Sequence, residues 1–140
     1  MDTAGEESPS LLLIEENRSI MGPLRDWLTM ALPDVQLIQT TDRRRGVYLN
    51  RSQKPDAVLT DVSALGARGA EHIGRVKAAQ PEAAVFALVG VDHPPNESAL
   101  IRAGAEACTC IWRLRTDLLP HLQTHLKTQA RAIRSGVPIN

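Results

Sequence analysis

Residues 11–17 read LLLIEEN, four consecutive aliphatic side chains followed by two glutamates and an asparagine. A short, continuous apolar run of this kind is typical of a parallel strand that is buried on both faces. Similar runs recur further along the chain, at residues 35–38, 57–60, 84–89 and 107–112. The five runs together predict five buried strands.

Segments with helical spacing of apolar residues separate these runs. In the first segment, Ser19 can cap a helix whose apolar residues recur with a period near 3.6. Asp42 can cap the second helix, and Pro94-Pro95-Asn96 can begin the fourth. Five strands that alternate with five helices predict an α/β fold, a flavodoxin-like, doubly wound parallel sheet with strand order 2-1-3-4-5.

Length and composition limit the classes of function. The chain has 140 residues, which favours one domain, and we place it at residues 10–134 between a disordered lead-in (1–9) and a tail (135–140). Sixteen basic and sixteen acidic side chains give a net charge of zero, which gives no reason to expect nucleic-acid or membrane-surface binding. The acidic start of the chain does not resemble an export signal, so we expect the protein in the cytoplasm.

Three acidic residues follow two of the predicted strands. Glu15 and Glu16 come directly after the first strand, and Asp61 comes after the third. In this strand order the first and third strands are neighbours, and ligands bind at the carboxyl ends of such strands. Like charges gathered at one point repel each other unless a cation compensates them, and Mg²⁺ prefers carboxylate oxygens. We therefore expect an acidic pocket with a candidate Mg²⁺ site.

An ordered set of segments resembles the response-regulator receiver (CheY-like) domain of bacterial two-component systems. The set consists of LLLIEEN, DAVLTDV, Gly69 and AGAEACTCI, and the resemblance covers residues 10–127. The stretch WLTMALPDVQLI is most similar to NarL-type receivers. The resemblance implies a signalling module rather than an enzyme, with a sensor kinase or another signalling protein as partner and dimer formation as a further expectation.

The resemblance also assigns roles by position. Asp61 matches the aspartate that accepts the phosphoryl group. Glu15 and Glu16 match the acidic pair that holds Mg²⁺, for which the family normally uses aspartates. Ser63 matches the residue whose backbone carbonyl completes the protein ligands of the metal.

Several positions depart from the family pattern. Val89 stands where the family has Thr or Ser, Ile111 where it has Lys, Cys108 at the aromatic switch position and Leu65 in place of a proline. Without that lysine, only a metal ion would offset the charge of a phosphoaspartate, and an unpaired oxyanion in a half-buried site costs several kcal/mol in rough terms. We therefore expect weak or vestigial Mg²⁺ binding and an atypical receiver, or pseudo-receiver, that is not switched by phosphate.

The residues leave several alternatives open. The chain can be a stand-alone module or the receiver of a longer transcriptional regulator, whose separate output domain would then contact nucleic acid. A small flavodoxin-like enzyme is the weaker alternative, because no glycine-rich phosphate loop follows the first strand. The arginines at 43–45 and the four histidines, among them His72, are interpreted as surface residues.

A docking surface is expected on the face formed by the fourth helix, the fifth strand and the fifth helix. Trp112 and Leu114 lie where the fifth strand is predicted to leave the sheet, and tryptophan is enriched in interface hot spots. In the alternative interpretation, Trp112 folds inward and fills the space that the missing lysine leaves.

Overall fold

The computed structural model describes residues 8–90 and 97–135. Its strands are parallel and form one sheet in the order β2-β1-β3-β4-β5, which confirms the predicted topology. The strands are β1 (Ser10–Ile14), β2 (Gln36–Thr40), β3 (Ala57–Asp61), β4 (Ala84–Val89) and β5 (Ala105–Cys110). The helices are α2 (Arg18–Ala31), α3 (Arg43–Gln53), α4 (Arg68–Ala79), α5 (Glu97–Ala103) and α6 (Leu119–Ser135).

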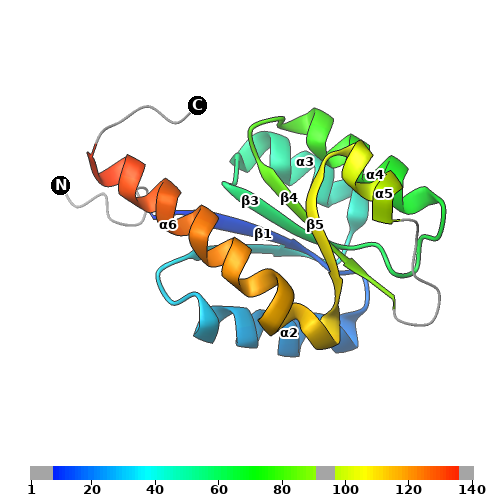
Figure 1. Ribbon diagram of the computed structural model, residues 1–140, viewed down its shortest axis with the longest axis horizontal. Helices are drawn as coiled ribbons and strands as arrows, with labels where there is room; N and C mark the ends of the chain where they lie inside the picture. The colour runs from blue at the N-terminus through cyan, green and yellow to red at the C-terminus, as the bar shows by residue number, and fades with distance from the viewer. Residues whose placement is uncertain (1–7, 91–96, 136–140) are drawn as a thin grey trace.

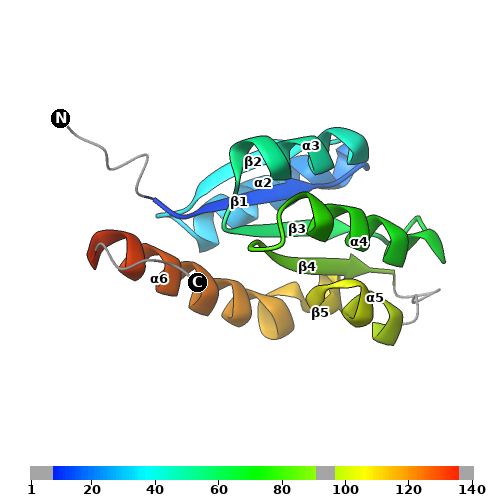
Figure 2. The ribbon, with the colours of Figure 1, turned by 90° about the horizontal axis from the view of Figure 1, so that it is seen from above.

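Helices cover both faces of the sheet (Figures 1 and 2). Helices α2 and α6 lie on one face, and α3, α4 and α5 lie on the other. Alternate residues of β1 enter the two layers, because successive side chains of a strand point to opposite faces. Leu11 and Leu13 pack with α2 and α6, whereas Leu12 and Ile14 pack with α3 and α4. In the described ranges, no helix combines the length and apolar character needed to cross a membrane.

The first two helices begin with side-chain caps. Asp42 caps α3 as predicted, since its carboxylate accepts from the backbone N–H groups of Arg44 and Arg45. The cap of α2 is Asn17 and not Ser19. The Asn17 side chain accepts from both the backbone and the hydroxyl of Ser19, so Ser19 is already inside the first turn. The predicted start of the fourth helix at Pro94-Pro95-Asn96, and most of the lead-in, lie outside the described residues.

The fifth strand ends earlier than predicted. Its last residue is Cys110, and a 3-10 turn (Ile111–Arg113) and a wide helical turn (Leu114–Leu118) then lead into α6. This path buries Leu114, which is 3% exposed and belongs to the core between the sheet, α2 and α6. Leu114 is therefore packed in the core rather than exposed, although it also lines a groove that Trp112 borders, and its role in docking stays a prediction.

A helical glycine sets how closely α3 packs on the sheet. Gly46 is buried in α3, and a Cβ atom added there would lie 2.7 Å from Cγ1 of Ile14. Ile14 is 1% exposed and packs in the core between the sheet, α3 and α4. The close approach of α3 to β1 therefore depends on the absence of a side chain at residue 46.

We predict that Gly46→Ala destabilises the protein by about 1–2 kcal/mol, because overpacking in the core outweighs the helix propensity gained. Gly74→Ala is the matched control, since Gly74 lies in α4 and an added Cβ would meet nothing within 4 Å. It should stabilise by roughly 0.5–1 kcal/mol. Urea unfolding of the two variants measures both changes, and two shifts of the same sign would contradict the prediction.

Candidate functional site

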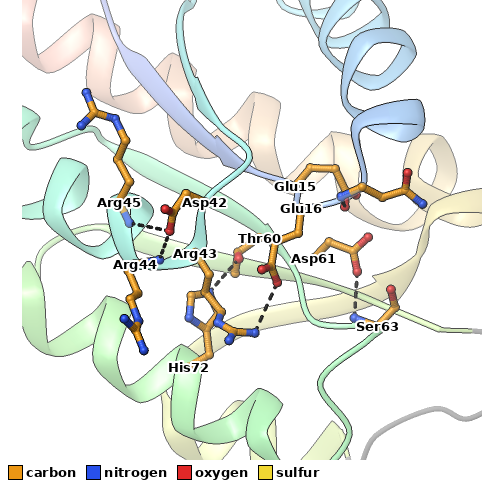
Figure 3. A network of polar contacts seen from close by, with 11 residues as sticks. Glu15, Glu16, Asp42, Arg43, Arg44, Arg45, Thr60, Asp61, Ser63 and His72 are labelled. Carbon is orange, nitrogen blue, oxygen red and sulfur yellow. Dashed lines mark hydrogen bonds and ion pairs between the residues drawn. The ribbon is translucent and has the colours of Figure 1, made fainter.

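The pairing of β1 with β3 brings Glu15 next to Asp61. In this parallel pair, Ile14 lies opposite Thr60, so the residues that follow them share one edge of the sheet. The carboxylates of Glu15 and Asp61 are close to each other at this edge (Figure 3). The sequence predicted that acidic side chains after the first and third strands lie together, and Glu15 and Asp61 do so.

Glu15 is a buried acid without full hydrogen bonding. The residue is 3% exposed, and its Oε2 accepts from the backbone N–H of Asn17 at 3.1 Å. Its Oε1 is buried and has no hydrogen-bond partner. Burial, followed by the close carboxylate of Asp61, raises the pKa of Glu15 to about 8. At neutral pH the pair therefore holds a proton unless a cation takes its place.

Glu16 turns away from this pair. Its side chain is exposed, and its Oε1 lies 3.3 Å from Nη1 of Arg43 at the start of α3 (Figure 3). The prediction that all three acids cluster is thus wrong for Glu16. The reason is electrostatic, because Arg43 offers an opposite charge whereas Glu15 and Asp61 would repel a third carboxylate.

Asp61 lies at the end of β3 and is partly exposed. Its Oδ1 accepts from the backbone N–H of Ser63 at 2.8 Å, which fixes the turn after the strand. Within the ranges that the structure describes, no three His, Cys, Asp or Glu residues are arranged to hold a metal ion. The unpartnered Oε1 of Glu15 beside Asp61 nevertheless fits a small hard cation, which accepts two carboxylates and completes its shell with water.

The remaining positions around the site are apolar or point elsewhere. Val89 ends β4 and is 7% exposed, and it offers no hydroxyl to the acidic pair. Ile111 lines a different cavity next to α2. The guanidinium group of Arg113 pairs with Asp117 at 2.9 Å and not with the acidic pair. Cys108 packs partly buried against the α3–α4 side of the core, where burial and then Glu97 raise the pKa of its thiol.

Two contacts near the site were not predicted from the sequence. His72, which the sequence suggested was a surface residue, is 5% exposed, and its Nε2 lies 3.0 Å from Oγ1 of Thr60. Its position next to Ile73 and four residues before Val76, on the buried side of α4, could have indicated that His72 is buried. Arg43 is half-buried rather than fully solvated, and its partner Glu16 lies 27 residues away, so no local pattern could reveal the pair.

Trp112 lies on the surface and is 82% exposed, which excludes the alternative in which it fills the core. It borders an apolar groove of about 660 Å³ together with Ile20, Pro23 and Trp27 of α2. The groove is therefore formed by α2 and the turns after β5, and docking on the face of α5, β5 and α6 stays a prediction.

We predict that Glu15 makes the protein less stable as pH rises. A carboxyl group whose pKa is raised by folding contributes stability below pH 4.5, and that stability is lost as pH rises through about 8. Near pH 7 the loss should approach about 1.4 kcal/mol per pH unit, which corresponds to one proton. Glu15→Gln should abolish this slope in urea unfolding measured with a chelator present.

Above about pH 7.5 the slope from Glu15 is separated from that of His72, because unfolded histidine is then mostly neutral. Burial, with help from Arg43 and Arg75, lowers the pKa of His72 from 6.5 to about 4, so its contribution is lost only as pH falls through that lower range. Glu16→Gln is the matched control and should keep the wild-type slope. An unchanged slope in Glu15→Gln would show that Glu15 is not the titrating group.

Comparisons with known proteins agree with this fold. The chain matches no protein-family model, and no curated protein matches its sequence. Solved structures do match. The signal receiver domain of a DNA-binding response regulator from Colwellia psychrerythraea is 24% identical, with a TM-score of 0.72 over 86% of this chain and 99% of that chain. A CheY-like receiver domain protein from Methanospirillum hungatei is 16% identical, with a TM-score of 0.73 over 89% and 98% of the two chains.

A third match is to a response regulator in a phosphorylated state. A response regulator from Burkholderia pseudomallei, solved with a phosphorylated aspartic acid, calcium ion and citrate, is 17% identical over 92% of this chain and 72% of that chain, with a TM-score of 0.66. At these identities the similarity concerns the fold. The order of the strands, the helices on both faces and the acids at the ends of β1 and β3 give this chain the fold of the response-regulator receiver domains.

Proposed function

We propose that this chain is a receiver-type signalling module of a two-component or phosphorelay system, with Asp61 at the phosphoacceptor position. It acts in the cytoplasm as an atypical receiver that docks onto a sensor kinase or another signalling protein, and it has no enzymatic role of its own. Its similarity to NarL-type receivers and its degenerate switch positions, Val89, Cys108 and Ile111, are part of this proposal.

The observation that carries the proposal is the close pair of Glu15 and Asp61 without a compensating cation. A phosphoryl group on Asp61 adds close to two negative charges beside Glu15. The guanidinium group of Arg43 beside this edge already pairs with Glu16. Val89 has no hydroxyl group that could hydrogen-bond to a phosphoryl group. A phosphoryl group on Asp61 would therefore gain no hydrogen bond there and drive no loop movement.

A Mg²⁺ ion would be held by the carboxylates of Glu15 and Asp61 and, following the family pattern, by the backbone carbonyl of Ser63. When bound, it would supply positive charge to phosphoryl oxygens. Glu16 could join only by leaving Arg43, and a metal must also displace the proton that the raised pKa of Glu15 favours. We therefore expect weak Mg²⁺ binding.

A receiver within a longer regulator is the second candidate. The Colwellia domain is described as the signal receiver domain of a DNA-binding response regulator, and this chain covers 99% of it. In that case a separate output domain would contact nucleic acid, and the module described here would control it by docking.

We predict that the wild-type protein forms no stable acyl phosphate when it is incubated with acetyl phosphate and Mg²⁺. The double variant Val89→Thr/Ile111→Lys introduces a hydroxyl and a flexible ammonium side chain at the two family positions, and it should gain the mass of one phosphoryl group. Asp61→Asn within that double variant should remove the gain. Intact mass spectrometry measures all three proteins, and beryllofluoride with Mg²⁺ gives an independent reading by NMR.

A wild-type adduct that Asp61→Asn removes, accompanied by a change in association, would contradict the pseudo-receiver proposal and support an ordinary receiver. Absence of the adduct from the double variant as well would mean that the lost hydroxyl and lysine are not the reason for the silence.

We predict that Trp112 serves docking and not stability. Because 82% of its surface is exposed, Trp112→Ala should leave the melting temperature within about 2 °C of the wild type. It should weaken self-association of the chain, measured by sedimentation at increasing concentration. Tyr48→Ala is the control, since Tyr48 is 58% exposed on α3 at the opposite face and should change neither quantity. A large drop in melting temperature with unchanged association would refute the docking role.

A further inference from the structure

Helices α3 and α4 enclose a small polar cavity on the face of the sheet opposite α2. The cavity has a volume of about 280 Å³. Four arginines line it, Arg43 and Arg44 from α3 and Arg68 and Arg75 from α4. The chain as a whole has no net charge, so this gathering of one sign is a local feature.

The charges of these arginines are only partly balanced. Arg75 pairs with Glu71 at 2.6 Å, and Glu71 also lines the cavity. Arg43 pairs with Glu16, which lies outside it. In the part of the chain that the structure describes, the guanidinium groups of Arg44 and Arg68 have no carboxylate partner. The cavity wall thus carries four cations against one anion, which favours a bound counter-anion.

His72 lies at the buried side of the cavity. Its Nε2 contacts the hydroxyl of Thr60, and the residue itself is 5% exposed. Burial and then the charges of Arg43 and Arg75 hold the pKa of His72 near 4, so the ring is neutral at pH 7. The His72 ring therefore adds no charge to the cavity, and the arginines are the groups that attract an anion there.

The directions of the side chains separate the cavity from a general basic surface. Arg43 and Arg44 extend toward α4 and His72, whereas Arg45 extends away from them (Figure 3). Asp42 caps the helix from which all three side chains project, so these side chains start from an ordered first turn. Two of the three consecutive arginines therefore serve the cavity.

We propose that the α3–α4 cavity binds a small phosphate-type oxyanion. Guanidinium groups bind phosphate oxygens through paired N–H donors, and several of them converging from two helices can surround a tetrahedral anion. The volume is slightly below that of ordinary small-molecule pockets, which fits inorganic phosphate, pyrophosphate or the phosphate end of a nucleotide. The site is distinct from Glu15 and Asp61, and its existence does not depend on phosphorylation there.

Arg43 connects the two sites. A phosphate oxygen that takes a donor from Arg43 competes with Glu16 for the same guanidinium. Glu16 is then free to turn toward Glu15 and Asp61, so occupation of the cavity favours a cation at the acidic pair. Because such coupling is reciprocal, a cation at the acidic pair also favours the oxyanion.

Titration calorimetry with inorganic phosphate, pyrophosphate and ADP tests the proposal. We expect saturable binding with one site, weakened about tenfold or more in Arg44→Ala and in Arg68→Ala, since each removes charge-assisted hydrogen bonds. Arg45→Ala removes the same charge from the neighbouring residue and should leave the affinity unchanged. ADP binding no tighter than pyrophosphate would identify the phosphates as the recognised group, and tighter ADP binding would extend the site to a nucleoside.

Two outcomes would overturn the proposal. One is the absence of saturable binding of all three probes at millimolar concentration. The other is an equal loss of affinity in Arg45→Ala and Arg44→Ala, which would assign the binding to net charge alone. Asp61→Asn should bind phosphate as the wild type does, so failure of the signalling proposal and failure of this one give different results.

Discussion

The burial of β1 on both faces is the constraint on which the other features of this molecule depend. Its four aliphatic residues, Leu11 to Ile14, are at most 1% exposed, because β2 and β3 flank the strand and helices cover both of its sides. Such a strand leaves the core only at its carboxyl end, where the parallel strands reach the edge of the sheet. The next residue, Glu15, is still buried when it reaches that edge, and Asp61 is its neighbour. The raised pKa of Glu15 thus follows first from its burial and then from the neighbouring carboxylate of Asp61.

Much of the fold could be predicted from the sequence because apolar runs and helical periodicity are local signals. The strand order, the cap at Asp42 and the meeting of Glu15 with Asp61 depend on such signals together with general rules for parallel sheets. The differences from the prediction arose at a contact between residues far apart in the chain and at an irregular turn. Arg43 draws Glu16 away across 27 residues, and the burial of Leu114 depends on a non-standard turn that periodicity cannot describe.

Charge changes from acidic to basic between the edge of the sheet and helices α3 and α4. The uncompensated pair of Glu15 and Asp61 comes first, the ion pair of Glu16 and Arg43 follows, and the arginine cavity comes last. Burial keeps the first end protonated and the histidine beside the other end neutral. The acidic pair and the arginine cavity would each accept an ion of opposite charge.

The two tryptophans of the chain have an optical consequence. Trp27 and Trp112 line the same groove between α2 and the turns after β5, and the chain contains no other tryptophan. Intrinsic tryptophan emission therefore reports on this groove alone. With Trp112 in water and Trp27 half-buried, exclusion of solvent from the groove would shift the emission to shorter wavelength, while events at the acidic edge or in the arginine cavity would be silent in the spectrum. The protein thus contains a natural fluorescent probe of the surface on which docking is expected.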